Sequence, residues 1–162
     1  MTVLDDAISL EERARAYYEE AQHRVTDPSA KKILNLLAEE EKGHATALAE
    51  MKRGAYGALE ESLLPKQVLG LVEGAVKEGQ NVISTDASMK EILQKAMEIE
   101  QATRIFYEEK AAYADDDRVK ELFTTLAMQE LGHYLIVSSL SEYFDRPLEW
   151  VESAEFGLRP EY

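Results

Sequence analysis

The sequence predicts an all-α fold, a four-helix bundle with one long crossover between its two halves. Three observations support it. Apolar residues recur at three- and four-residue steps along four long stretches that hold almost no proline or glycine. Short turns join these stretches into two pairs, and residues 54–86 connect the pairs. The second pair also repeats the first after 89 residues, which indicates two helix hairpins related by a pseudo-twofold axis.

The first hairpin is expected before residue 54. Its apolar positions are Leu4, Ala7, Ile8, Ala14, Tyr18 and Val25 in one helix, and Ala30, Leu34, Leu37, Leu48 and Met51 in the next. Between the helices, Asp27 is a residue type that caps helix N-termini, and Pro28 suits the first helical position. These two residues predict a short turn and the start of the second helix.

The second hairpin should begin near residues 84–93, and "ADDDR", residues 114–118, marks its turn. Its apolar positions are Leu93, Ala96, Met97, Tyr107 and Ala111 in one helix, and Val119, Phe123, Leu126, Val137 and Leu140 in the other. The repeat between the hairpins is gapless, and 14 of the 47 positions from 4 to 50 are identical to those 89 residues later.

The crossover and the C-terminal tail complete the predicted fold. Residues 54–86 hold five of the eight glycines together with Pro65, and a short helix is expected around residues 66–76. Residues 146–162 are expected to form a short amphipathic helical cap with four apolar residues, Trp150, Val151, Phe156 and Leu158. We therefore expect a single domain over residues 1–162, with the bundle at about 3–143.

Composition narrows the class of protein. A net charge of −14 argues against nucleic acid or an anionic membrane as a partner, and it suits cations. No stretch approaches the ~18 uninterrupted apolar residues of a membrane span. The acidic N-terminus lacks the basic start and apolar run of a secretory signal, which favours a cytoplasmic location. With no cysteine, the chain has neither disulfides nor thiolate metal sites.

Two near-copies of one octapeptide carry two of the three histidines. "LAEEEKGH", residues 37–44, and "LAMQELGH", residues 126–133, both end in Glu-x-x-His. At 100° per residue, a glutamate and a histidine three apart lie about 60° from each other on the helix surface. Glu41 and His44 therefore share one helix face, as do Glu130 and His133.

Charged residues interrupt the apolar faces of all four helices. Six ionisable side chains occupy steps where the pattern calls for an apolar residue: Glu11, Glu41, His44, Glu100, Glu130 and His133. Desolvating each of four carboxylates buried in one layer would cost on the order of several kcal/mol if the carboxylate had no partner. Two divalent cations would balance four negative charges, and two imidazoles would complete their ligands. The alternative is a set of protonated core polar groups without metal.

Neighbouring residues receive weaker assignments. Tyr18 and Tyr107 are placed to donate hydroxyl hydrogen bonds to the carboxylates, or else simply fill the core. The third Glu-x-x-His step ends in His23 and should face solvent, because Glu20 lies on the opposite face from Glu11. Glycine costs about 1 kcal/mol inside a helix; for Gly43 and Gly132 the sequence offers no firm physical account beyond close helix approach.

This pattern of one glutamate from each of two helices and Glu-x-x-His from each of the others resembles the rubrerythrin family of ferritin-like proteins, over residues of about 4–140. The resemblance implies a ferritin-like fold and a dinuclear iron site. Glu11 and Glu100 then resemble terminal ligands, and Glu41 and Glu130 resemble bridging ligands. His44 and His133 each resemble a ligand of one metal.

The resemblance also implies a function. It suggests an oxidoreductase that reduces peroxide or dioxygen, with iron as the usual metal and manganese or zinc as other occupants. The absence of cysteine removes the rubredoxin-like iron site, so the electron donor would be external, and a homodimer is common in the family. Rubrerythrins have a further glutamate one turn along the third helix. In this chain, Met97 and Thr103 stand one turn either side of Glu100, and neither is a glutamate. An iron-binding or ferroxidase protein without turnover, and a bundle held together by a structural metal, are the alternatives.

Overall fold

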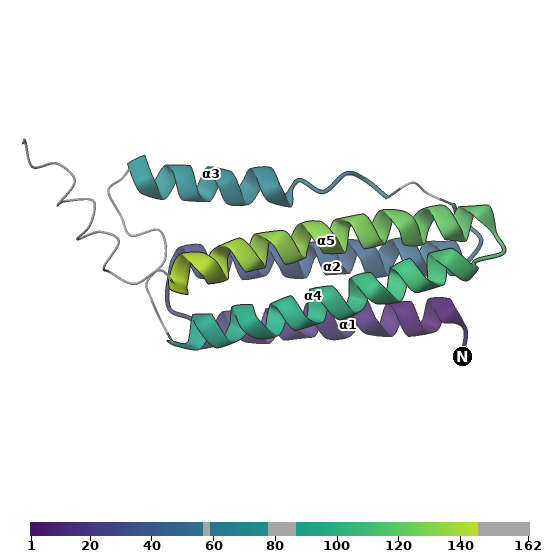
Figure 1. Ribbon diagram of the computed structural model, residues 1–162, viewed down its shortest axis with the longest axis horizontal. Coiled ribbons are helices and arrows are strands. Elements are labelled where there is room, and N and C mark those ends of the chain that lie inside the picture. The colour runs from purple at the N-terminus through teal and green to yellow at the C-terminus, as the bar shows by residue number, and fades with distance from the viewer. Residues whose placement is uncertain (57–58, 78–86, 146–162) are drawn as a thin grey trace, which may run out of the picture.

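The computed structural model describes residues 1–56, 59–77 and 87–145, and every regular element in them is helical (Figure 1). Four long helices form the body of the molecule, as the sequence predicted: α1 (Val3–Ala21), α2 (Pro28–Lys52), α4 (Ala87–Tyr113) and α5 (Asp117–Asp145). A short 3-10 helix, η1 (Gln22–Arg24), follows α1, and α3 (Leu64–Lys77) lies in the crossover. The all-α bundle of two hairpins is confirmed.

The helices pair in chain order. α1 packs along α2, and α4 packs along α5, so that each hairpin is a unit. Contacts between α1 and α4 and between α2 and α5 join the two hairpins into one bundle. α3 contacts α2 and α5 and runs alongside them on the outside of the bundle, away from α1 and α4 (Figure 1). α3 therefore lies over the face that α2 and α5 share.

Local sequence signals explain where the helices begin. The hydroxyl of Thr2 accepts a hydrogen bond from the backbone N–H of Asp5, and the Asp5 carboxylate accepts one from the Thr2 N–H, forming a capping box. At α2, the Asp27 carboxylate accepts from Ala30 N at 2.9 Å, and Pro28 opens the helix, as predicted. These caps satisfy N–H groups that have no partner inside the helix.

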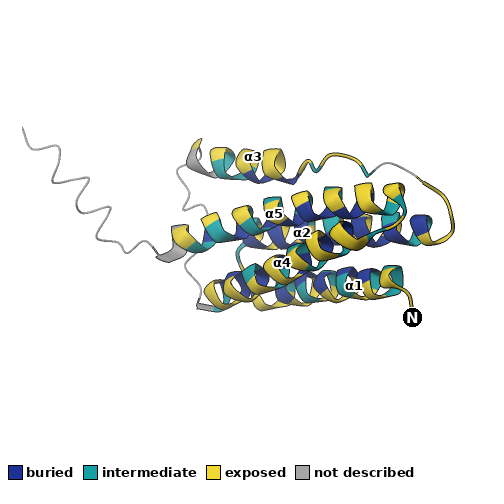
Figure 2. Cartoon of the chain, turned by 45° about the vertical axis from the view of Figure 1, so that its right-hand side comes forward, coloured by how far each residue is buried: buried dark blue, intermediate teal, exposed yellow. Residues whose placement is uncertain are grey.

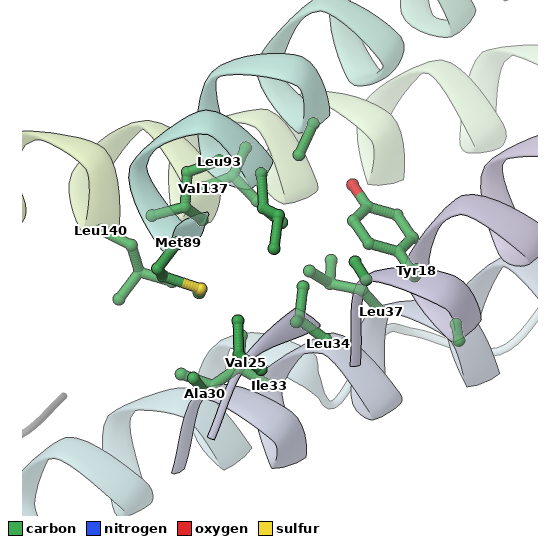
Figure 3. Close-up of a cluster of buried hydrophobic side chains, with 14 of the residues drawn as sticks. Tyr18, Val25, Ala30, Ile33, Leu34, Leu37, Met89, Leu93, Val137 and Leu140 are labelled. Atoms are coloured by element: carbon green, nitrogen blue, oxygen red, sulfur yellow. The ribbon is translucent and has the colours of Figure 1, made fainter. Parts of the chain in front are cut away.

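Two apolar clusters fill the bundle, one on each side of a polar layer. Buried residues face inward on all four long helices (Figure 2). One cluster includes Tyr18, Leu34 and Leu93 (Figure 3), and the other includes Tyr107 and Phe123. Burying each large side chain stabilises the fold by roughly 1.5–3 kcal/mol, so the clusters hold the helices in register on both sides of the layer.

The remaining predictions on the fold have different outcomes. The short crossover helix exists as α3, somewhat longer than the predicted residues 66–76. The predicted cap over 146–162 lies outside the described residues, and the boundaries of a single domain at 1–162 stay a prediction. Among the described residues, none of the helices is long and apolar enough to cross a membrane.

Candidate metal centre

Six ionisable side chains from four helices meet in the polar layer between the two apolar clusters. α1 and α4 each supply one glutamate, whereas α2 and α5 each supply a glutamate and a histidine. All six are at most 1% exposed: Glu11, Glu41, His44, Glu100, Glu130 and His133. The structure therefore brings together the whole set that the sequence singled out, at the centre of the bundle.

The six residues form two overlapping groups, each with four potential ligand atoms within 4.8 Å of one another. One group contains Glu11 and His44, and the other contains Glu100 and His133. Both groups contain two further carboxylates, Glu41 and Glu130. The arrangement thus has two terminal positions of one carboxylate and one imidazole each, joined by two shared carboxylates.

The first terminal position is centred on Nδ1 of His44. This nitrogen lies 2.8 Å from Oε1 of Glu130, 3.3 Å from Oε2 of Glu41 and 3.6 Å from Oε2 of Glu11. Three carboxylates from three different helices therefore converge on one ring nitrogen.

The second position repeats this arrangement around Nδ1 of His133. The nitrogen lies 3.1 Å from Oε1 of Glu41, 3.4 Å from Oε2 of Glu100 and 3.9 Å from Oε2 of Glu130. The two imidazole rings are nearly parallel, with centroids 5.4 Å apart. Glu41 and Glu130 each have oxygens near Nδ1 of both rings, so each faces both positions.

Several polar atoms of this layer have no hydrogen-bond partner among the described residues. At least one such buried oxygen or nitrogen is found on every one of the six side chains, for instance Oε2 of Glu11 and Nδ1 of His44. Leaving a buried polar group unpaired costs roughly 1–3 kcal/mol, and more when it is charged. The layer therefore has the donor atoms that a bound cation would satisfy.

Two tyrosines connect the hairpins at the carboxylates. The Tyr18 hydroxyl on α1 donates to Oε1 of Glu100 on α4, and the Tyr107 hydroxyl on α4 donates to Oε1 of Glu11 on α1. Burial, followed by the charge of the neighbouring carboxylate, raises the pKa of both phenols. Both groups therefore stay protonated, and each fixes one oxygen of a terminal carboxylate, leaving the other oxygen toward the layer.

The protein favours the neutral form of some of these carboxyl groups. Burial and the charge of Glu41 raise the pKa of Glu11 to about 8. Burial and the surrounding carboxylates raise the pKa of Glu130 well above its ordinary value. In the metal-free protein, protons thus relieve part of the repulsion among the four carboxylates. A metal ion would displace these protons.

The imidazoles oppose that trend. Burial acts to lower the pKa of His44, but the close carboxylates of Glu11 and Glu130 raise it well above its ordinary value. Burial acts in the same way on His133, and the charges of Glu100 and Glu41 outweigh it. Burial would raise the pKa of Glu41, yet the two imidazoles hold it below its ordinary range. Glu41 is therefore the carboxylate that both histidines stabilise in its charged form.

The outer nitrogens of the two rings contact residues that sequence reasoning missed. Nε2 of His44 lies 2.8 Å from Oε1 of Gln129, and Nε2 of His133 lies 3.5 Å from Oε2 of Glu40. Glu40 and Gln129 each precede a shared glutamate, and they are equivalent under the 89-residue repeat. The two octapeptides differ at this position, and that difference is the sequence signal that could have pointed to Glu40 and Gln129.

Two hollows reach the layer, one beside each histidine. The larger, of about 780 Å³, is bordered by His44, Gly43 and five glutamates, Glu39, Glu40, Glu50, Glu60 and Glu61. The smaller, of about 370 Å³, is bordered by His133, Gly132 and the apolar residues Leu59, Pro65, Met128 and Ile136. A Cβ added at either glycine would meet no atom within 4 Å. Close helix approach is therefore the wrong explanation for these glycines.

Three residues near the layer in sequence take no part in it. His23 is exposed, as predicted, and lies on η1, beyond the C-terminal end of α1. Arg15 forms an ion pair with Glu19 on the helix surface rather than reaching the layer. Thr103, one turn after Glu100, donates its hydroxyl to the Ile99 carbonyl of its own helix. None of these three contributes an atom to the buried layer.

The fold and the layer together define a class: a four-helix bundle whose buried carboxylates and histidines are suited to a dinuclear metal site. The family model described as Rubrerythrin matches residues 2–141, and the chain belongs to the rubrerythrin family. A hypothetical protein from Pyrococcus furiosus has a similar fold, with a TM-score of 0.63 and 24% identity over 91% of this chain and 89% of that chain. A comparison with curated proteins gave no match.

Proposed function

We propose that this protein binds a pair of iron ions in the buried layer and reduces peroxide or dioxygen with electrons from an external donor. The observation that carries this proposal is the pair of overlapping four-residue groups that share Glu41 and Glu130. Two divalent ions would balance the four carboxylates. The unpaired buried atoms are the oxygens and nitrogens that such ions take as ligands.

The ligand roles follow from the grouping. Glu11 and His44 would hold one ion, and Glu100 and His133 the other, while the shared carboxylates would contact both. When bound, an iron pair would supply electrons to an oxidant and accept them again from a reductant. Oxygen and imidazole ligands without thiolate favour iron or manganese over a closed structural zinc site, although zinc can occupy such a set in purified protein.

The chain's own residues would shape that chemistry. The two tyrosine hydroxyls hold the terminal carboxylates in place, which keeps the site organised for two ions. Apolar clusters on both sides exclude water from the layer. The hollows beside the histidines are wide enough to admit a molecule as small as peroxide.

Steady-state peroxide consumption tests this proposal. The full chain loaded with ferrous iron should consume many equivalents of peroxide when a reductant such as ascorbate or reduced rubredoxin is present, and the Glu41→Ala variant should not. Stoichiometric zinc in protein from iron-replete cells, with no uptake of iron or manganese, would contradict the redox assignment.

A second candidate function is oxidation of ferrous iron as the product-forming step, without turnover of peroxide. The five glutamates around the larger hollow favour it, because an acidic surface concentrates cations beside His44. The same assay separates the two functions: a ferroxidase would consume peroxide only in proportion to the ferrous iron added. If metal removal abolished the fold without any redox activity in either assay, the metal would be structural.

The proposal includes two partners. We propose that a redox protein or small molecule donates the electrons, since these 162 residues hold no cysteine that could bind a rubredoxin-like iron. We also propose a homodimer, to be measured by light scattering on the purified protein. A monomer would leave the proposed chemistry intact, since all six side chains belong to one chain.

A further inference from the structure

The two histidines are equivalent in the repeat, yet their outer nitrogens face different chemical groups. Gln129, from the second hairpin, lies 2.8 Å from Nε2 of His44 in the first. Glu40, from the first hairpin, lies 3.5 Å from Nε2 of His133 in the second. Each ring is thus approached from the opposite hairpin, once by a neutral amide and once by a carboxylate.

Both outer partners suit an imidazole ring whose Nε2 carries the N–H. The Gln129 side-chain nitrogen donates to the Glu60 carbonyl at 2.9 Å, so its oxygen is the atom that faces His44. An amide oxygen can only accept, which makes Nε2 of His44 the N–H donor to Gln129. The Glu40 carboxylate, 3.5 Å from Nε2 of His133, is an ion-pair partner of that nitrogen rather than its hydrogen-bond acceptor. A metal ion in the layer would displace the proton from Nδ1 of each ring and take its lone pair, while Nε2 would keep its N–H toward the outer partner.

The partners differ in charge. A carboxylate that accepts the outer N–H increases the basicity of a ligating imidazole, and removing such a partner typically weakens metal binding about 10- to 100-fold. The contact of His44 with Gln129 is shorter than that of His133 with Glu40, which favours the stronger contact at the amide. A neutral amide, however, adds no attraction for a cation bound to the ring. Glu40 has only 21% of its side chain exposed, so water screens its charge only in part.

We propose that Glu40 makes the metal position at His133 the tighter of the two, while Gln129 leaves the position at His44 weaker. This inference rests on the dinuclear site proposed above. It predicts an order of filling: the first divalent ion binds at His133 and the second at His44. The weaker position is then the one that borders the acidic hollow, where ions would enter and leave.

A zinc titration of the chelator-stripped full chain tests the order. With ¹⁵N-labelled imidazoles, the three histidines give separate ring signals, which His44→Gln and His133→Gln variants assign. The exposed His23 serves as an internal reference. After one equivalent of zinc, the His133 signals should reach their bound positions while those of His44 remain free. The second equivalent should then shift His44.

Three variants at the outer positions sharpen the test. Glu40→Gln should weaken the His133 position by about 10- to 100-fold and make the two rings respond together. Gln129→Glu should strengthen the His44 position and also make them respond together. The double exchange should reverse the order. Glu39→Gln, which changes an exposed glutamate beside Glu40, is the matched control and should keep the parent's order.

Three results would overturn the inference while leaving the dinuclear site intact. The rings could shift together in the parent protein as two zinc ions bind, or the double exchange could leave the order unchanged. A third zinc ion that Glu40→Gln abolishes would make Glu40 a direct ligand instead. If zinc shifted neither ring, the proposed metal site itself would fail, and this inference with it.

Discussion

His44 and His133 occupy matching positions in the two hairpins, but the surroundings of the two rings differ. The hollow at His44 is acidic and about twice the volume of the hollow at His133, which is bordered mainly by apolar side chains. Inward of the rings, the same four carboxylates and two tyrosines are arranged almost symmetrically. The two hairpins are therefore alike in the layer and unlike outside it.

This comparison separates two physical demands. A buried layer of four carboxylates is tolerable only if positive charge or protons balance it, and that requirement falls equally on both hairpins. Outside the layer, no such balance is required, so the residues around each ring can set access and affinity separately. If the layer is as symmetric in its energetics as in its geometry, equivalent substitutions in the two hairpins should have equal effects.

The largest effect is expected from the shared carboxylates. Glu41→Ala and Glu130→Ala should each lose both metals, because each carboxylate faces both positions. Glu11→Ala and Glu100→Ala should each weaken one position only. Metal analysis after equilibrium dialysis measures the stoichiometry, and His23→Ala, on the exposed η1, is the control that should retain the parent's metal content.

A pH effect on the metal-free protein comes next. The pKa of Glu11 is about 8 in the folded protein against 4.5 for the free side chain. Folding therefore favours the protonated form, so this contribution to stability is complete below pH 4.5 and is lost as the pH rises through 8. Glu11→Gln keeps the volume without the charge, and at pH 9 it should melt about 5–10 °C above the parent.

The same variant should melt close to the parent at pH 5, where Glu11 is largely protonated. Glu12→Gln changes an exposed neighbour and should shift neither melting temperature. Thermal melts in chelator at both pH values make the measurement. A variant that melts lower than its parent at pH 9 would show that the charged form of Glu11 stabilises the fold.

The tyrosine contacts should have a smaller and matched effect. Tyr18→Phe and Tyr107→Phe each remove one hydroxyl and leave a buried carboxylate oxygen without its donor. Each should lower the free energy of unfolding by about 1–3 kcal/mol, measured by urea denaturation. Tyr113→Phe, at an exposed position, is the control. A loss of stability in only one of the two variants would show that the two tyrosine contacts are not equivalent.

The smallest effect is expected at the glycines. A Cβ at Gly43 or Gly132 meets nothing within 4 Å, and alanine is favoured over glycine inside a helix. Gly43→Ala and Gly132→Ala should therefore each stabilise the protein by about 0.5–1 kcal/mol. Urea denaturation measures the gain. Destabilisation would indicate that the helices need the glycine backbone there.

The sequence was sufficient for the helices and for the membership of the buried layer. Helical periodicity locates inward positions, and a charged residue at such a position, as at Glu11 or Glu100, stands out against an apolar stripe. The start of α2 was also predictable from local sequence, because Asp27 caps the helix and Pro28 occupies its first turn.

Contacts across the bundle were harder to predict. Tyr18 bonds Glu100 on the opposite hairpin, a pairing that depends on how the two hairpins pack and not on periodicity within α1. Glu40 and Gln129 lie beside the inward face rather than on it, so a search for apolar positions filled by charge passes over them. The role of Gly43 does not follow from the sequence, because open space beside a helix leaves no trace in sequence spacing.

An anaerobic equilibrium titration of the metal-free protein with ferrous iron tests the central claim most directly, namely that the buried layer holds two ions. Near-ultraviolet absorbance should change linearly and break at two equivalents per chain. The Glu41→Ala variant should show no tight binding in the same titration. A break at one equivalent, or saturable binding that survives in the variant, would contradict a site built on shared carboxylates.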